Sequence, residues 1–181
     1  MAGTDRSIAD GMAADIEEID AVIGQFLEFA RGTQEQQHVC DLERLVDEID
    51  SRYQRLGKAL QRTRGNVPLL ALAPLSVRRA ITNLIDNALR HASGPIEIQT
   101  SAESGAAVIE VRDRGPGIPA DEAERLKQPF TRLDPARSGG GGSGLGLAIV
   151  ERVARAHGGR LDLLPREGGG LTARLILARA S

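Results

Sequence analysis

The sequence predicts an α+β fold, a two-layer α/β sandwich that follows an N-terminal bundle or coiled-coil helix. Three observations carry this prediction. Residues 4–31 place apolar side chains at alternating spacings of four and three, as the seam of packed helices does. After residue 37, short strand-like runs and helical periodicities succeed one another. Hydrophobic residues make up 41% of the 181 residues and aromatic residues 2%, so an aliphatic core is expected.

The first segment reads as one long helix. Its apolar stripe consists of Met12, Ile16, Ile19, Ile23, Phe26 and Ala30. One helix cannot bury such a stripe alone, so a partner helix is expected, and docking on the chain's own globular domain is the alternative. Gly32 ends the helix and a polar connector follows. We therefore divide the chain into residues 1–37, a helix plus connector, and residues 38–181, an α/β domain.

The second segment is expected to mix helices with mostly antiparallel strands. In chain order the expected elements are a strand over 39–42, a helix over 42–56 stopped by Gly57, strands over 58–63 and 67–72, a helix from Pro74 to His91, strands over 95–101 and 107–111, a short helix over 121–126, a loop over 131–143, a helix over 144–156 and a hairpin of 161–164 with 171–177. Pro74 suits the first turn of its helix, where a missing N–H costs nothing.

Composition excludes several classes of function. The formal net charge is -2, which gives no electrostatic basis for binding nucleic acid. The single cysteine, Cys40, rules out an internal disulfide and any multi-cysteine metal site. No apolar run approaches the roughly 20 residues of a membrane-spanning helix.

The first chemical motif lies on the helix from Pro74 to His91. Asn83 and Asn87 are four residues apart and share a helix face, and Arg90 and His91 stay on that side. Amide oxygens suit Mg²⁺ when a nucleotide brings its own negative charge, and Arg90 suits a terminal phosphate. A plain solvent-exposed polar face is the alternative, although two Asn residues in a helix interior are unfavourable without a function.

The second motif is Asp113-Arg114-Gly115-Pro116-Gly117, directly after an apolar strand. A carboxylate at a strand end accepts a hydrogen bond from an exocyclic amine such as that of adenine, and it discriminates against ligands without that donor. Gly115 and Gly117 allow the backbone to approach a flat ring closely. An ordinary turn after a strand is the alternative.

The third motif, Gly144-Leu145-Gly146-Leu147, opens a helix, so its free N–H groups and the helix dipole favour an anion. Arg132 and Arg137 in the preceding loop are suited to approach phosphates. A flexible loop before a helix is the alternative, and the run from Gly139 to Gly142 is either a natural mobile element or an engineered linker.

Together these motifs resemble the N, G1 and G2 boxes of bacterial sensor histidine kinases, with a spacing closest to the osmosensing kinases of the EnvZ type. The segment from Leu126 to Phe130 resembles the F box, with Leu126 where Phe is commoner. Asp15 to Glu18, together with Gln25 to Leu27, looks like the second helix of the dimerisation and phosphoacceptor hairpin.

The resemblance implies a Bergerat-type (GHKL) ATP-binding fold with ATP and Mg²⁺ as ligands. It assigns catalytic roles to Asn83, Asn87 and Arg90, and Mg²⁺ coordination to Asn87 with support from Asn83. The nucleotide contacts that it implies fall to Asn87, Arg90, His91, Asp113, Gly115, Gly117, Ile118, Phe130, Arg132, Arg137, Gly144, Leu145 and Gly146. Among these, Asp113 takes the adenine amine and Phe130 anchors one end of the loop.

The chain departs from the family at the phosphoacceptor. Its three histidines are His38, His91 and His157, and none lies in a His-Glu-Leu-Arg-Thr-Pro-like context. We therefore expect a fragment that binds Mg-ATP without phosphorylating itself. The resemblance implies, for the complete protein, a partner histidine helix, a response regulator, homodimerisation and a place as the cytoplasmic portion of a bacterial inner-membrane sensor.

Two other functions compete with this one. The first is a related ATPase or an anti-sigma-type serine kinase, but hydrolytic members of the fold carry a glutamate base at the position of Asn83. The second is a dimerising signalling module with a silent nucleotide site, which the apolar stripe of residues 12–30 would support.

Overall fold

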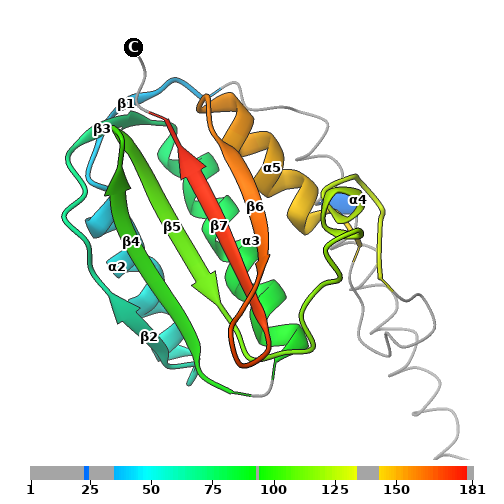
Figure 1. Cartoon of the computed structure of the whole chain (residues 1–181). Coiled ribbons are helices and arrows are strands. Elements are labelled where there is room, and N and C mark those ends of the chain that lie inside the picture. Colours follow the sequence, from blue (N-terminus) through cyan, green and yellow to red (C-terminus); the bar gives the residue numbers. More distant parts are fainter. Residues whose placement is uncertain (1–22, 25–34, 93, 134–142, 179–181) are drawn as a thin grey trace, which may run out of the picture.

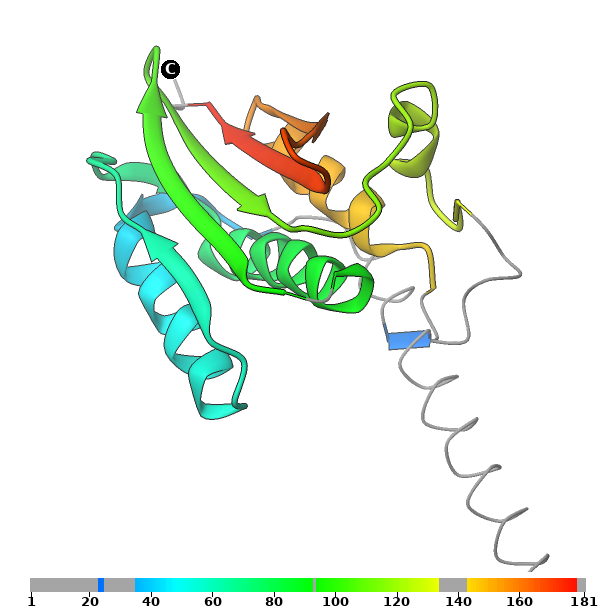
Figure 2. The same ribbon diagram turned by 60° about the horizontal axis from the view of Figure 1, so that its bottom comes forward.

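The protein, seen in a computed structural model, is described over residues 23–24, 35–92, 94–133 and 143–178. Five strands form one sheet in the order β2-β4-β5-β7-β6, and β1 pairs with β3 in a separate two-stranded sheet. Helices α2, α3 and α5 cover a single face of the large sheet (Figure 1), and the turned view shows them as one layer beneath it (Figure 2). The predicted two-layer α/β sandwich is confirmed.

The elements follow the chain in an order close to the predicted one. They are β1 (His38–Cys40), α2 (Leu42–Arg55), β2 (Leu60–Thr63), β3 (Leu70–Leu72), α3 (Pro74–His91), β4 (Ile96–Glu103), β5 (Ala106–Arg112), α4 (Ala123–Leu126), α5 (Gly146–Ala156), β6 (Arg160–Pro165) and β7 (Leu171–Leu177). Only β2 and β4 run parallel among the strand pairs of the described residues, and the others are antiparallel.

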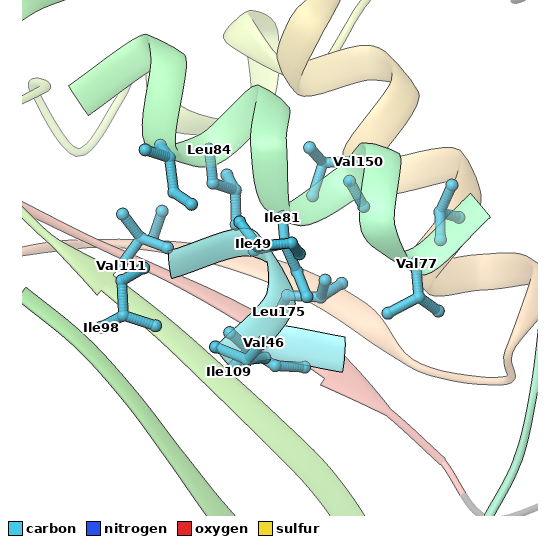
Figure 3. Close-up of a cluster of buried hydrophobic side chains, with 14 of the residues drawn as sticks. Val46, Ile49, Val77, Ile81, Leu84, Ile98, Ile109, Val111, Val150 and Leu175 are labelled. Carbon is cyan, nitrogen blue, oxygen red and sulfur yellow. The ribbon is translucent and has the colours of Figure 1, made fainter. Parts of the chain in front are cut away.

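The core lies between the helices and the sheet and is aliphatic, as the composition predicts. Ile81 and Ile85 of α3 and Ile109 of β5 have exposed fractions of 0%. Figure 3 shows side chains from α2, α3, α5 and three strands meeting in this layer, with Ile81 close to its centre. Burying such side chains stabilises the fold by roughly 1.5–3 kcal/mol each. The large layer beneath the sheet therefore fixes α3 and α5, which carry the polar motifs.

No helix of the described residues covers the opposite face of the sheet, yet Val108 on that face is only 1% exposed. Arg174 pairs in register with Glu110, and Val108 pairs with Ile176 in the next row. The guanidinium of Arg174 reaches past this row to form an ion pair with Glu103. This ion pair joins β7 to β4 across the intervening strand β5 on this face of the sheet.

Helix α2 is tied to the edge strand β2 by polar contacts. Asp41 caps the helix by accepting the backbone N–H of Arg44 at 3.1 Å. Arg62 of β2, with a side chain 9% exposed, forms an ion pair with Glu43 of α2 and donates to the hydroxyl of Thr100 at 3.1 Å. The same hydroxyl donates to Glu43 at 2.6 Å. This network pairs the buried guanidinium of Arg62 with a carboxylate, which offsets part of the cost of burying its charge.

Several predicted element bounds differ from the structure by one to three residues, and three of these differences are informative. The helix predicted over 42–56 ends one residue earlier, at Arg55, and Leu56 is 61% exposed because the chain turns at Gly57, where φ is +71°. Strand β3 begins at Leu70 rather than at residue 67, since Pro68 cannot donate to a ladder. Helix α5 begins at Gly146, two residues later than predicted.

The predicted N-terminal helix over residues 4–31 falls outside the described residues except for Ile23 and Gly24, which are helical. The division of the chain at residue 37 therefore stays a prediction. None of the helices in the described ranges is both long and apolar enough to cross a membrane.

Candidate nucleotide-binding site

Helices α3 and α5 run antiparallel, so the two ends of the pair differ. At one end, the backbone N–H of Ala73 before α3 donates to His157 after α5 at 3.0 Å. We call this the connector end. Farther along, Gly146 at the start of α5 lies against Asn83, because a Cβ at Gly146 would be 3.4 Å from Asn83 Oδ1. The start of α5 and the last turns of α3, from Asn83 onward, form what we call the open end.

The two asparagines lie on α3 at the open end and differ in their hydrogen bonding. Asn83 Nδ2 donates to the carbonyl of Arg79 at 3.0 Å, which turns its Oδ1 toward Gly146. Asn87 is half-buried and forms no hydrogen bond with any described residue. Its amide oxygen is therefore available to a ligand, whereas Asn83 is fixed by its own helix.

Basic side chains gather at the end of α3. Arg90 and His91 occupy its last turn, where the helix dipole favours cations. Partial burial and then the charge of Arg90 lower the pKa of His91 below its ordinary value, and Arg132 acts in the same direction. Arg132 is thus near enough to add to the same positive field. These groups suit an anionic ligand.

Asp113 follows β5 and is only 5% exposed. Its Oδ1 accepts the backbone N–H of Gly115 at 2.7 Å, and its backbone N–H donates to the carbonyl of Leu171 at 3.0 Å. The carboxylate is therefore held in one orientation by its own turn. Its second oxygen receives no hydrogen bond from the described residues, so it can accept one from a ligand amine.

The glycines of this turn allow close backbone packing. A Cβ at Gly115 would lie 2.7 Å from the carbonyl oxygen of His91, so the turn sits directly against the end of α3. Gly117 has a φ of +74°, which favours glycine. Ile118 is half-buried and packs on the hydrophobic core. The strand end, this turn and α3 are thereby brought together, as the sequence predicts.

The third motif lies at the N-terminus of α5. No side chain caps this helix, and Leu145 precedes it with its own N–H bonded to the hydroxyl of Ser143 at 3.2 Å. The first turn of α5 contains no acidic residue, so its N–H groups and dipole remain suited to an anion. Leu145 itself is fully buried, with an exposed fraction of 0%. Its side chain therefore serves the core, and only its backbone can serve a ligand.

Phe130 and Gly144 hold the two ends of the intervening loop together. The N–H of Phe130 donates to the carbonyl of Gly144 at 3.0 Å. A Cβ at Gly144, where φ is +69°, would lie 2.9 Å from the backbone of Phe130. The backbone of Phe130 makes this anchor, while the residue as a whole is 59% exposed. Arg137 and the run from Gly139 to Gly142 fall outside the described residues.

Sequence reasoning missed several residues that shape the site from a distance. Glu35 caps α3 by accepting the N–H groups of Leu75 at 2.9 Å and Ser76 at 2.8 Å. Ala73, the residue before α3, has no side chain that could cap the helix, and this feature of the sequence indicated that the cap comes from elsewhere in the chain. The hydroxyl of Tyr53 donates to Asp86, between the two asparagines, at 2.6 Å. No local pattern marks such a pairing between helices.

His157 follows the last turn of α5, and both of its ring nitrogens form hydrogen bonds. Its Nε2 accepts the N–H of Ala73 at 3.0 Å, and its Nδ1 donates to the carbonyl of Val153 at 2.8 Å. An imidazolium has no acceptor, so it could not make the first bond.

No group of three or more His, Cys, Asp or Glu residues that could hold a metal ion occurs in the described ranges. A cation beside Asn87 would therefore take further ligands from the bound molecule and from water. The free amide oxygen of Asn87 fits Mg²⁺, which prefers oxygen ligands, usually retains waters and binds phosphate oxygens.

Comparison with known proteins decides the family. Residues 73–181 match the family of histidine kinase-, DNA gyrase B-, and HSP90-like ATPases. The chain is 33% identical to the histidine kinase domain of the Escherichia coli osmosensor EnvZ, covering 83% of this chain and 93% of that one with a TM-score of 0.63. The chain belongs to this family. It is the ATP-binding catalytic domain of a sensor histidine kinase.

Longer relatives place this kinase domain among two-component sensors. It is 40% identical over 136 residues to the sensor protein CutS of Streptomyces coelicolor, covering 73% of this chain and 33% of CutS. It is 32% identical over 185 residues to the sensor histidine kinase GtrS of Pseudomonas aeruginosa, covering 97% of this chain and 36% of GtrS. The chain thus spans about a third of the length of these relatives.

The kinase domain also shares its fold with full-length ShkA, solved in complex with AMPPNP. The TM-score is 0.76 over 97% of this chain and 39% of that one, at 23% identity. The predicted fold and family are therefore confirmed, whereas the roles of individual site residues stay predictions.

Proposed function

We propose that this kinase domain binds Mg-ATP at the open end of α3 and α5 and donates the γ-phosphate to a histidine on a separate helix, for relay to a response regulator. One observation carries the proposal. Asn87, Arg90 and the second carboxylate oxygen of Asp113 receive no partner from the described residues. All three belong to segments that meet at the end of α3.

Each group has a distinct task in the proposed site. Asp113 is oriented by the N–H of Gly115 and accepts a hydrogen bond from the adenine amine through its other carboxylate oxygen. Arg90 and the first N–H groups of α5 neutralise the phosphates, since charge-assisted bonds and a helix N-terminus are the usual anion ligands. Asn87 holds Mg²⁺, with Asn83 in support, and the ion supplies charge neutralisation between phosphate groups when bound.

Catalysis in this arrangement consists of positioning and electrostatics. Phosphoryl transfer needs the γ-phosphate held in line with its acceptor, with the charge on its oxygens compensated. The protein supplies fixed dipoles and cations, while the acceptor comes from elsewhere. The fixed amide of Asn83 is not a base, which disfavours hydrolysis of ATP without a partner.

Calorimetric titration with a non-hydrolysable ATP analogue, with and without Mg²⁺, tests the binding step. We expect saturable binding that tightens with Mg²⁺ and no binding of the GTP counterpart. A separate protein that carries a phosphoacceptor histidine helix is then added with radiolabelled ATP. Acid-labile label on that protein supports transfer, and stoichiometric label on this chain alone would contradict it.

We further propose that the chain is the cytoplasmic portion of a longer, dimeric, membrane-anchored sensor. Its relatives CutS and GtrS are sensor proteins more than twice its length, which supports this. Immunodetection of residues 38–181 in membrane and soluble cell fractions, before and after salt extraction, tests the anchoring. Cross-linking in the same membranes tests the dimer.

A further inference from the structure

The contact between Tyr53 and Asp86 joins α2 to the helix that carries the proposed ligand groups. Tyr53 lies near the end of α2 and is only 5% exposed. Its hydroxyl donates to Asp86 Oδ1 at 2.6 Å. Asp86 is exposed and stands directly before Asn87 on α3. The bond therefore connects a rigid core side chain to a surface carboxylate beside the site.

Asp86 also precedes Arg90 by four residues. An acid four residues before a base on a helix is the favoured order for an ion pair. The same chain forms such a pair between Glu151 and Arg155, at 2.6 Å on α5. Nevertheless Arg90 forms no ion pair with any described residue, Asp86 included. Another contact must therefore hold the Asp86 carboxylate away from the Arg90 guanidinium.

The phenol is suited to that task. Burial and then the hydrogen bond to Asp86 raise the pKa of Tyr53 above its ordinary value, so the hydroxyl remains a donor at any physiological pH. The ring is held in the core with Ile49 of α2, which is 1% exposed. A short bond from a fixed donor holds the carboxylate toward α2.

We propose that Tyr53 is a positioning residue: by holding Asp86, it prevents an ion pair with Arg90 and keeps the Arg90 guanidinium available to the phosphates of the nucleotide. This inference rests on the proposed function, because it assigns Arg90 to the phosphates. It adds two residues, Tyr53 and Asp86, that set the availability of a ligand group without touching the ligand.

Substitution of Tyr53 by phenylalanine tests the proposal. Tyr53→Phe keeps the ring and removes the hydroxyl, and because Asp86 is exposed, its freed carboxylate can turn toward Arg90. The ion pair that Asp86 and Arg90 can then form competes with the ATP phosphates for Arg90. ATP affinity should therefore fall by about twofold at low salt. Adenosine affinity should not change, since adenosine has no phosphate. The loss should vanish at high salt, which screens exposed pairs.

Thr82→Val is the matched control. It removes a hydroxyl from α3 that donates to the carbonyl of Arg79 at 2.9 Å and has no link to Arg90. ATP affinity should equal that of the wild type. Thermal unfolding of each variant checks that the fold is intact. If Thr82→Val lowers ATP affinity as much as Tyr53→Phe does, the effect is a general loosening of α3 and the proposal fails.

The double variant Tyr53→Phe/Asp86→Asn separates positioning from packing. An amide cannot form an ion pair, so the double variant should regain wild-type ATP affinity although the phenol is still missing. A double variant as weak as Tyr53→Phe would overturn the proposal. The NMR resonance of the Arg90 Nε–H group should shift in Tyr53→Phe without nucleotide and return in the double variant.

The two proposals fail in different ways. If the wild-type domain binds no ATP, the proposed function fails, and the inference fails with it. If the wild-type domain binds ATP, Tyr53→Phe binds it equally well and the Arg90 resonance is unmoved, the inference alone is overturned.

Discussion

The two ends of the α3–α5 pair use polar groups in opposite ways. At the connector end, Glu35 satisfies the first N–H groups of α3, and His157 bridges Ala73 and Val153. Gln37 adds a bond to the carbonyl of Ala156 at 3.3 Å. At the open end, the corresponding groups of Asn87, Arg90 and α5 meet no partner among the described residues.

This difference separates polar groups that support the fold from those that await a ligand. A buried group that already has its bonds contributes stability, and its removal costs stability. A group left without partners at the end of a helix contributes little to the fold and is available for binding. The same two helices thus provide both, and mutations at their two ends should affect different measurements.

The largest effect is expected at the connector end. His157→Ala removes a buried ring and leaves the Ala73 N–H without an acceptor, so the free energy of unfolding should fall by about 2–4 kcal/mol. Urea denaturation measures this change. His38→Ala, at an exposed histidine, is the control and should stay within about 0.5 kcal/mol of wild type. ATP affinity that falls while stability is unchanged would contradict the comparison.

The next effect belongs to the open end. Asp113→Asn replaces an acceptor with an amide that also presents a donor, so ATP affinity should fall by roughly tenfold to a hundredfold. Calorimetry against the non-hydrolysable analogue measures it, with the exposed Asp121→Asn as a control of equal charge change. A large loss of stability without a loss of affinity would place Asp113 with the structural groups instead.

A smaller effect is expected from the cap at Glu35. Glu35→Ala should lower the free energy of unfolding by about 1 kcal/mol, the usual value of a helix cap. Partial burial opposes ionisation, but the bonds from Leu75 and Ser76 outweigh it and hold the pKa of Glu35 below its ordinary value. The stabilisation by the Glu35 cap is therefore complete at pH values above the ordinary carboxyl pKa. It is lost as the pH falls through the lowered pKa of Glu35.

The pH dependence of that cap can be checked directly. Denaturation of wild type and Glu35→Ala should differ at pH 7 and converge in acid, whereas exposed Gln36→Ala should match wild type throughout. A difference that persists unchanged at pH 3 would show that the carboxylate charge is not the cause.

The smallest effect concerns His91. Its lowered pKa leaves the ring neutral at pH 7 in the free protein, and bound phosphates would favour the charged form. ATP affinity should therefore rise as pH falls, by less than about tenfold. His91→Gln should remove the part of this pH dependence that comes from His91. The part that comes from protonation of ATP itself should remain. Equal proton uptake by both proteins, from calorimetry in two buffers, would refute the role.

Local rules predicted most of the fold. The bounds of α3 were predicted correctly because Pro74 fits the first turn and the apolar positions repeat without interruption up to Ala88. Strands β4 and β5 followed from alternation around the turn at Ser104. The errors lie at ends, such as Leu56, where one residue decides whether a side chain still faces the core.

The residues of the candidate site also divide into those that a local pattern predicts and those that only long-range contacts reveal. Asn83, Asn87 and Asp113 were found because each stands in a short motif whose residue types have a chemical reason. Glu35 and Tyr53 were missed because the partners of Glu35 lie 40 and 41 residues away in the chain and the partner of Tyr53 lies 33 residues away. Only the packed fold brings these pairs together, so no spacing in the sequence could have marked them.

The bond between Phe130 and Gly144 has a consequence for how this domain can vary. It closes the segment over residues 131–143 at its base, so the start of α5 does not depend on that segment's length. Doubling the number of residues between two joined chain positions costs only about 0.6 kcal/mol in closure entropy. Insertions there should therefore be tolerated by the fold, which makes this segment the natural place to attach a reporter or to graft a loop from a relative.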